Sequence, residues 1–225
     1  NGRWEYQITD TNQIPQEHSW KPINVPFPLG SQLSGSDEIL LPGKVLWYKK
    51  QFSYKPGEYH TYLNFEAVDQ QYIVYLNGIE VGRHIGGYEP FGFDVSSYIK
   101  YQNALLVKCT DPSDTGEYAY GKQKIQHGGM WYTPISGIWQ TVWMEPVAEK
   151  HIANPRITPD IDRGLLTVKA ELSMNTSSDM VEVSVYDGNR LVAAGKSIHT
   201  EAVEVAMPDD VKLWSPDSPF LYTLK

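Results

Sequence analysis

Two groups of acidic residues lie close enough in the sequence to act as carboxyl pairs. The first is Glu66 with Asp69, and the second is Asp111, Asp114 and Glu117. Two carboxyls held ~5–5.5 Å or ~6.5–9.5 Å apart carry out the acid–base steps of glycosidic bond hydrolysis. We expect plainer roles here: strand-end and turn capping for the first pair, and solvated loop positions for the second group. No catalytic residue is therefore assigned. A calcium clip at Asp111 and Asp114 stays open as an alternative, although no ladder of ligands like that of an EF-hand supports it.

The segment from Lys122 to Pro134 is the stronger candidate for a functional loop. Its sequence is KQKIQHGGMWYTP, and it belongs to a long irregular stretch that begins at Asp111. Loops of this length without secondary structure of their own are uncommon and often functional. An indole ring is apolar and rigid, so this loop could stack against a sugar or, equally, pack at a domain interface. The candidate substrate-proximal residues are Trp131, Tyr132, His127 and Gln126, although a lone loop histidine is more typical of an ordinary surface.

No metal or cofactor is expected. The chain has one cysteine, Cys109, which excludes an internal disulfide framework and any multi-cysteine metal site. Cys109 lies in an apolar run, so we expect it to be buried. The six histidines are scattered singly and show no zinc-ligand spacing. The Gly86-Gly87 pair indicates backbone geometry with positive φ rather than a phosphate site.

The charge of the chain argues against nucleic acid as a partner. Its 225 residues include 19 basic and 27 acidic side chains, for a net charge of −8, and no basic cluster stands out. No apolar run approaches the ~18 residues of a membrane span. The lack of disulfides leaves the compartment open, because a bacterial cytoplasm, a periplasm and secretion are all compatible with it.

The elements that must position these residues are predicted to be strands. Period-2 patterns recur and helical periodicity does not. Strands are expected at 45–52, 59–65, 72–76, 79–81, 104–109 and 141–145. Asn77-Gly78 is the residue pair that a type I′ hairpin turn requires, since both central residues need positive φ. The run 104–109 is apolar at successive positions, so we place it centrally in a sheet.

The pattern changes after Pro146, which predicts two domains, 1–148 and 149–225. In the second domain, apolar and polar residues alternate over 166–172 and 181–185, and the turn at 187–189 leads into 191–194. Strands of this spacing are typical of an immunoglobulin-like sandwich. The last expected strand, 220–224, has no evident partner, so we expect this sandwich to be truncated at its C-terminal end, with the partner strand beyond residue 225.

Five segments, in order, resemble the sugar-binding domain at the amino terminus of glycoside hydrolase family 2. They are NGRW from residue 1, WKPINVP from 20, WYKK from 47, the run from Phe65 through YLNG to GGYEPFGFDV, and SGIWQTVWME from 136. The segment LWSPDSPFLYTL from 213 is similar to the family's immunoglobulin-like domain. The resemblance implies an all-β chain: a galactose-binding-like jelly-roll sandwich followed by an incomplete immunoglobulin-like β-sandwich.

The resemblance also implies a role. In the family, a (β/α)₈ barrel follows and carries both catalytic carboxylates, and this sequence shows no alternation of strands and helices. We therefore expect a front end without catalysis, whose partners are its own C-terminal barrel and that barrel's carbohydrate substrate. A retaining exo-β-glycosidase, β-galactosidase first, is the expected parent, and homo-oligomer contacts are a further expectation. The alternatives are a stand-alone carbohydrate-binding module and a structural or adhesive spacer.

Overall fold

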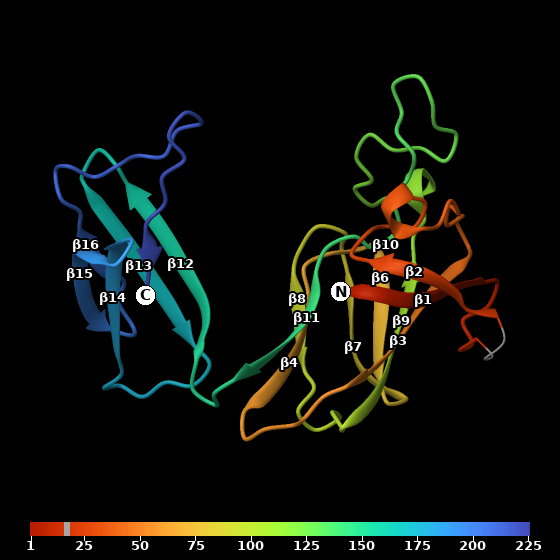
Figure 1. The fold of residues 1–225 in the computed structure, drawn as a ribbon, viewed down its shortest axis with the longest axis horizontal. Coiled ribbons are helices and arrows are strands. Elements are labelled where there is room, and N and C mark those ends of the chain that lie inside the picture. Colours follow the sequence, from red (N-terminus) through yellow and green to blue (C-terminus); the bar gives the residue numbers. More distant parts are fainter. Residues whose placement is uncertain (16–18) are drawn as a thin grey trace. The chain divides into compact units, whose positions relative to one another are not determined.

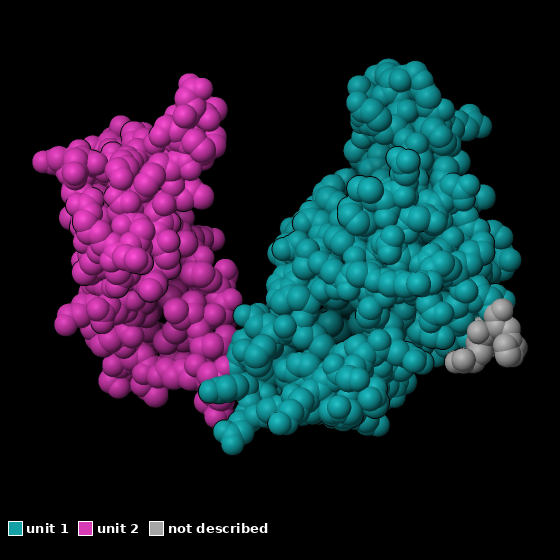
Figure 2. All heavy atoms as spheres, viewed as in Figure 1, with its two compact units in different colours: residues 1–147 teal, residues 148–225 magenta. Residues whose placement is uncertain are grey.

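The chain forms two compact units, residues 1–147 and residues 148–225 (Figure 2). The structure, a computed structural model, describes residues 1–15 and 19–225. Within these residues the regular elements are strands, joined by short 3₁₀ turns such as η2 (Gln32–Ser34) and η3 (Ser113–Thr115) (Figure 1). No described helix is long and apolar enough to cross a membrane. The all-β fold class predicted from the sequence is confirmed.

Unit 1 is a sandwich of antiparallel sheets. One layer is six-stranded, in the order β2 (Lys21–Val25), β1 (Gly2–Thr9), β3 (Val45–Ser53), β9 (Gln102–Thr110), β6 (Gln71–Leu76) and β7 (Ile79–Ile85). Shorter sheets complete the unit: β11 (Val142–Val147), β4 (His60–Phe65) and β8 (Phe91–Asp94), and the pair β10 (Gly137–Ile138) and β5 (Val68–Asp69). This is the jelly-roll-like architecture that the resemblance implied.

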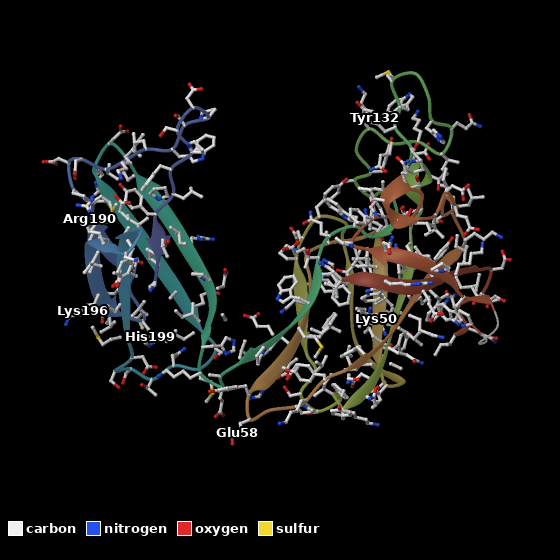
Figure 3. All side chains as sticks on the ribbon, viewed as in Figure 1. Lys50, Glu58, Tyr132, Arg190, Lys196 and His199 are labelled. Carbon is white, nitrogen blue, oxygen red and sulfur yellow. The ribbon has the colours of Figure 1, made fainter. Side chains whose placement is uncertain are left out.

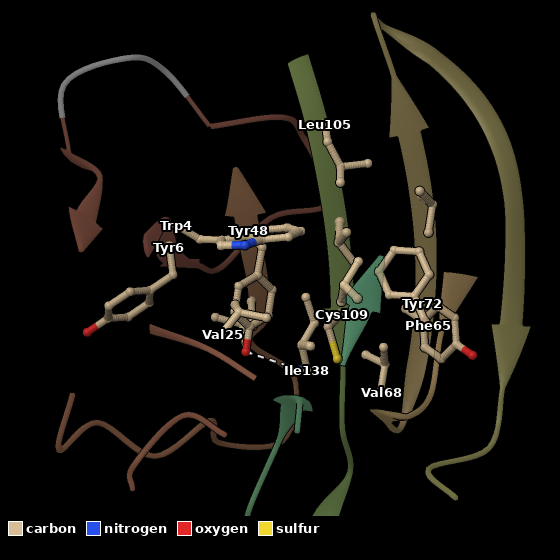
Figure 4. Close-up of a cluster of buried hydrophobic side chains, with 14 of the residues drawn as sticks. Trp4, Tyr6, Val25, Tyr48, Phe65, Val68, Tyr72, Leu105, Cys109 and Ile138 are labelled. Carbon is tan, nitrogen blue, oxygen red and sulfur yellow. Dashed lines mark hydrogen bonds between the residues drawn. The ribbon is translucent and has the colours of Figure 1, made fainter. Parts of the chain in front are cut away.

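Aromatic and branched aliphatic side chains fill the core of unit 1. Figure 4 shows Trp4, Tyr48 and Phe65 among them, and the ring edge of Trp4 meets Tyr48 at 6.4 Å between centroids. The Tyr48 hydroxyl accepts a hydrogen bond from the Ile138 amide at 3.2 Å, so a polar atom deep in the core is satisfied by the strand β10. Because β10 comes directly after the loop predicted to be functional, this bond fixes one end of that loop to the core.

Two local predictions for unit 1 are confirmed, and one is wrong in part. Asn77 and Gly78 have φ of 54° and 85° and join β6 to β7, as a type I′ turn requires. Cys109 is fully buried. The strand β9 is central, between β3 and β6, but only alternate side chains of it are buried, so its two faces are not equally apolar.

Unit 2 is a smaller sandwich of two three-stranded sheets. One is β12 (Ile152–Asp160), β13 (Leu165–Leu172) and β16 (Val203–Ala206), and the other is β15 (Arg190–Ile198), β14 (Met180–Asp187) and β17 (Thr223–Leu224). Its fully buried core consists of valines and one alanine, Ala170. The expectation for 220–224 is wrong: only Thr223–Leu224 is a strand, and its partner is β14 within the chain. Main-chain pairing between Lys225 and Ser184 extends this ladder.

Candidate functional site

The loop between η3 and β10 forms a projecting hairpin, which we call the arm (residues 118–135). In Figure 1 it is the green loop that stands out from the rest of unit 1. Its tip is closed by two main-chain hydrogen bonds between Gly128 and Trp131, at 3.0 and 3.1 Å. Gly128 and Gly129 have φ of 124° and 59°, values that side chains with a β-carbon rarely adopt, so the paired glycines allow the tight turn.

Further bonds lower in the arm hold its two sides together. The Tyr132 amide donates to the Lys122 carbonyl at 2.9 Å, and the Lys124 amide donates to the Tyr132 carbonyl at 3.1 Å. The side-chain oxygen of Gln123 accepts from the Ile135 amide at 2.5 Å. The arm is therefore a hydrogen-bonded hairpin rather than a loose loop, and its side chains have defined positions.

The base of the arm is clamped by Asp111. One carboxylate oxygen accepts from the Ser113 amide and the other accepts from the Ser136 hydroxyl, both at 2.6 Å. Because Asp111 precedes the arm and Ser136 follows it, this buried bond ties the two ends of the segment together. Asp114 adds a longer contact, accepting from the Ile125 amide at 3.3 Å.

The arm presents two aromatic rings, each paired with a lysine. The ammonium nitrogen of Lys124 lies 4.2 Å from the centroid of the Trp131 ring, and that of Lys122 lies 5.8 Å from the Tyr132 ring. Tyr132 is exposed and Trp131 half-buried (Figure 3 labels Tyr132). A rigid aromatic surface with adjacent cations can stack on the apolar face of a ring and donate hydrogen bonds to its polar substituents.

The four substrate-proximal candidates lie together on this arm. Gln126 and His127 are exposed beside the glycine turn, and Nδ1 of His127 lies 3.1 Å from the Ile125 carbonyl. Sequence reasoning missed Lys122 and Lys124, whose ring contacts depend on the hairpin pairing. The signal that could have found them is the complete lack of Asp and Glu between Glu117 and Glu145.

The acidic groups behave differently from expectation. Asp111 is not solvated: it is 6% exposed and serves as the clamp described above. Asp69 does not cap a turn: it is 5% exposed in β5, beside Gly87. Glu66 and Glu117 are exposed, and Glu66 accepts from the Thr141 amide at 3.3 Å. The structure thus brings together one acid from each group, Asp69 and Asp111, rather than the members of either group.

Burial changes the acidity of Asp69. Loss of solvent around the carboxyl, with the nearby Asp111 carboxylate as a second cause, raises the pKa of Asp69 to about 7. Near neutral pH this side chain is therefore partly protonated inside the protein. The position lies under the Gly86-Gly87 turn, where Trp139 donates from its indole nitrogen to the Gly87 carbonyl at 2.8 Å. Among residues 1–15 and 19–225, no group of three or more potential metal ligands occurs.

Two family profiles match the chain along nearly its whole length. Residues 1–145 match the family described as glycosyl hydrolases family 2, sugar binding domain, and residues 150–225 match glycosyl hydrolases family 2. The chain belongs to glycoside hydrolase family 2. The resemblance of its motifs to that family is confirmed.

Curated relatives in this family are glycosidases. The chain is 30% identical over its full length to a putative β-glucuronidase of Formosa agariphila, of which it covers 28%. Over 80% of its length it is 29% identical to a β-galactosidase of Thermoanaerobacter pseudethanolicus, of which it covers 25%. The chain therefore spans about a quarter of the length of these family 2 relatives.

Solved structures share the fold. A β-glucuronidase from Ruminococcus gnavus in complex with uronic deoxynojirimycin matches 99% of the chain with a TM-score of 0.74 and 22% identity, and the chain covers 41% of it. An uncultured Clostridium sp. β-glucuronidase matches the full chain with a TM-score of 0.72 at 22% identity. At this identity the likeness supports the family 2 sandwich fold and no particular substrate.

Proposed function

We propose that this chain is the non-catalytic front end of a retaining exo-β-glycosidase that cleaves O-glycosidic bonds in carbohydrates. Its role is to pack against a separate catalytic barrel and to supply one wall of the sugar pocket. The observation that carries the proposal is the arm, a hydrogen-bonded hairpin that holds Trp131 and Tyr132 away from the body of unit 1. A wall of this kind requires rigidity and an apolar face, and the arm has both.

The acids of the chain support a non-catalytic role. A retaining glycosidase needs two carboxyls that reach the same bond from an open pocket. Asp69 and Asp111 are buried, and Asp111 is already occupied by the Ser113 amide and the Ser136 hydroxyl. Asp114 lies at the base of the arm, where it accepts from the Ile125 amide. We infer that catalysis belongs to a barrel outside this chain, as in other members of family 2.

Hydrolysis of chromogenic glycosides tests this role. β-Galactoside, β-glucuronide and β-mannoside substrates would be offered to the chain alone and to the full-length protein. We expect turnover only by the full-length protein, and the substrate it accepts identifies the sugar. Turnover by a pure sample of the chain alone would contradict the proposal and return attention to Asp69 and Asp111.

The alternative of a stand-alone carbohydrate-binding module predicts a different result. The exposed rings of the arm could also bind a glycan without any barrel. A glycan array probed with the chain alone separates the two functions, because a pocket wall needs the rest of the pocket to hold a monosaccharide. Strong glycan binding by the chain, together with an inactive full-length protein, would favour the module.

A further inference from the structure

The arm is a basic segment in an acidic chain. The chain carries 27 acidic and 19 basic side chains, yet no Asp or Glu occurs between Glu117 and Glu145. Within that interval the charged residues are Lys122 and Lys124. The local charge is thus opposite to that of the protein as a whole, and it coincides with the aromatic surface.

Both lysines are held in place and remain available to a ligand. The hydrogen bonds from Tyr132 to Lys122 and from Lys124 to Tyr132 place the two lysines on either side of one aromatic residue. Neither lysine takes part in an ion pair with the described residues, whereas Lys44, Lys150 and others pair with carboxylates. An ammonium group over a ring keeps hydrogen-bond donors free, because it has three of them and the ring face provides no oxygen acceptor.

The combination of surfaces indicates the class of ligand. An aromatic face suits the C–H side of a pyranose, and an unpaired ammonium suits an anionic oxygen. A sugar that carries a carboxylate has both features in one small molecule. A neutral hexose would use the ring and leave the two cations without a matching charge.

We propose that Lys122 and Lys124 are specificity-determining residues that make the arm select a sugar bearing a carboxylate, that is, a β-linked uronoside. This inference rests on the proposed function, in which the arm forms part of the pocket of a glycosidase. The two lysines act by binding and positioning the carboxylate, and they take no part in bond cleavage.

The test compares a matched pair of substrates in the full-length protein, the para-nitrophenyl β-glycosides of D-glucuronic acid and of D-glucose. Steady-state kinetics on both would be recorded for wild type, K122Q, K124Q and the double variant. Each charge-assisted hydrogen bond lost is expected to raise the KM for the glucuronide by about tenfold, with the turnover rate and the glucoside kinetics unchanged. K124R should restore much of the loss, and added salt should reduce the difference between the substrates.

Lys55→Gln is the matched control, since Lys55 is an exposed lysine of unit 1 in the loop that includes Glu58. That loop lies at the opposite end of the unit from Tyr132 (Figure 3). A selective rise for the glucuronide in the arm variants, and none in K55Q, supports the inference. Equal changes for both substrates, no change, or activity on neutral glycosides alone would overturn it. In the last case the proposed function still stands if Y132A raises the KM, whereas inactivity on every glycoside overturns both proposals.

Discussion

The cores of the two units differ in kind. Unit 1 buries tryptophan, tyrosine and phenylalanine together with polar groups such as Asp69 and Asp111, whereas the core of unit 2 is built from valines and Ala170. The strongest electrostatic contact of unit 2, Lys150 with Asp179, lies at its surface. Unit 1 therefore carries buried groups that must be satisfied by specific partners, and it is the unit that holds the arm. Unit 2 has the simpler core expected of a supporting sandwich.

A glycine substitution in each unit sharpens this comparison and has the largest expected effect. Gly137 has φ of 81°, and a β-carbon there would lie 2.2 Å from the Tyr48 hydroxyl. We expect G137A to destabilise unit 1 by about 4 kcal/mol, combining backbone strain with overpacking. Gly188 in unit 2 has φ of 59° and open space around the same position, so G188A should cost only ~1–2 kcal/mol.

Urea unfolding measures both effects. Six of the seven tryptophans lie in unit 1 and Trp214 lies in unit 2, so intrinsic fluorescence mainly follows unit 1 and circular dichroism follows both. Equal costs for the two glycine variants would show that crowding around Gly137 is relieved without loss, and that the aromatic core is less tightly packed than its contacts indicate.

The next largest effect concerns the buried acid of unit 1. The pKa of Asp69 is raised to about 7, so the folded protein keeps this proton up to a pH at which the unfolded chain has lost it. The stability that follows is fully present below about pH 4 and is lost as the pH rises through about 7. D69N has no charge to bury, so we expect it to unfold at higher urea than wild type at pH 8, by about 2–4 kcal/mol.

At pH 4 the difference between D69N and wild type should disappear. The measurement is the urea midpoint of unit 1 at pH 4, 6 and 8, with the exposed Asp37→Asn variant as control. A D69N protein that is less stable than wild type at pH 8 would mean that the Asp69 carboxylate has a partner in the folded state that outweighs its burial.

The surface acid of unit 2 should show the opposite and smallest pH dependence. A hydrogen bond from Lys150, with a second from the Thr176 amide, lowers the pKa of Asp179 to about 2. Its contribution to stability is therefore present above about pH 4 and is lost as the pH falls through about 2. D179N should lower the urea midpoint of unit 2 only slightly at pH 7, since exposed pairs contribute little. A large loss at pH 7, or a loss that persists at pH 2, would contradict this account.

The same contrast explains what the sequence can predict. Strands of unit 2 such as 166–172 and 181–185 are visible because one buried face produces strict alternation. The Asn77-Gly78 turn and the family motifs of unit 1 are equally local. The approach of Asp69 to Asp111 is not predictable, because it depends on β5 pairing with β10 and on β6 pairing with β9. The lysine–ring contacts of the arm escape sequence reasoning for the same cause, since they require the register of the hairpin.

The central claim is that the arm of unit 1 touches the sugar, and the most direct test is Y132A against Y59A in the full-length protein. Both tyrosines are exposed, at 66% and 61%, so removal of either ring should have a similar, small effect on stability. Tyr59 directly follows Glu58, which lies at the opposite end of unit 1 from Tyr132 (Figure 3). We expect Y132A, and more strongly the W131A/Y132A double variant, to raise the KM for the accepted glycoside by about tenfold. Y59A should leave the KM unchanged. Identical kinetics for wild type, Y132A and the double variant would contradict the claim that the arm forms part of the pocket.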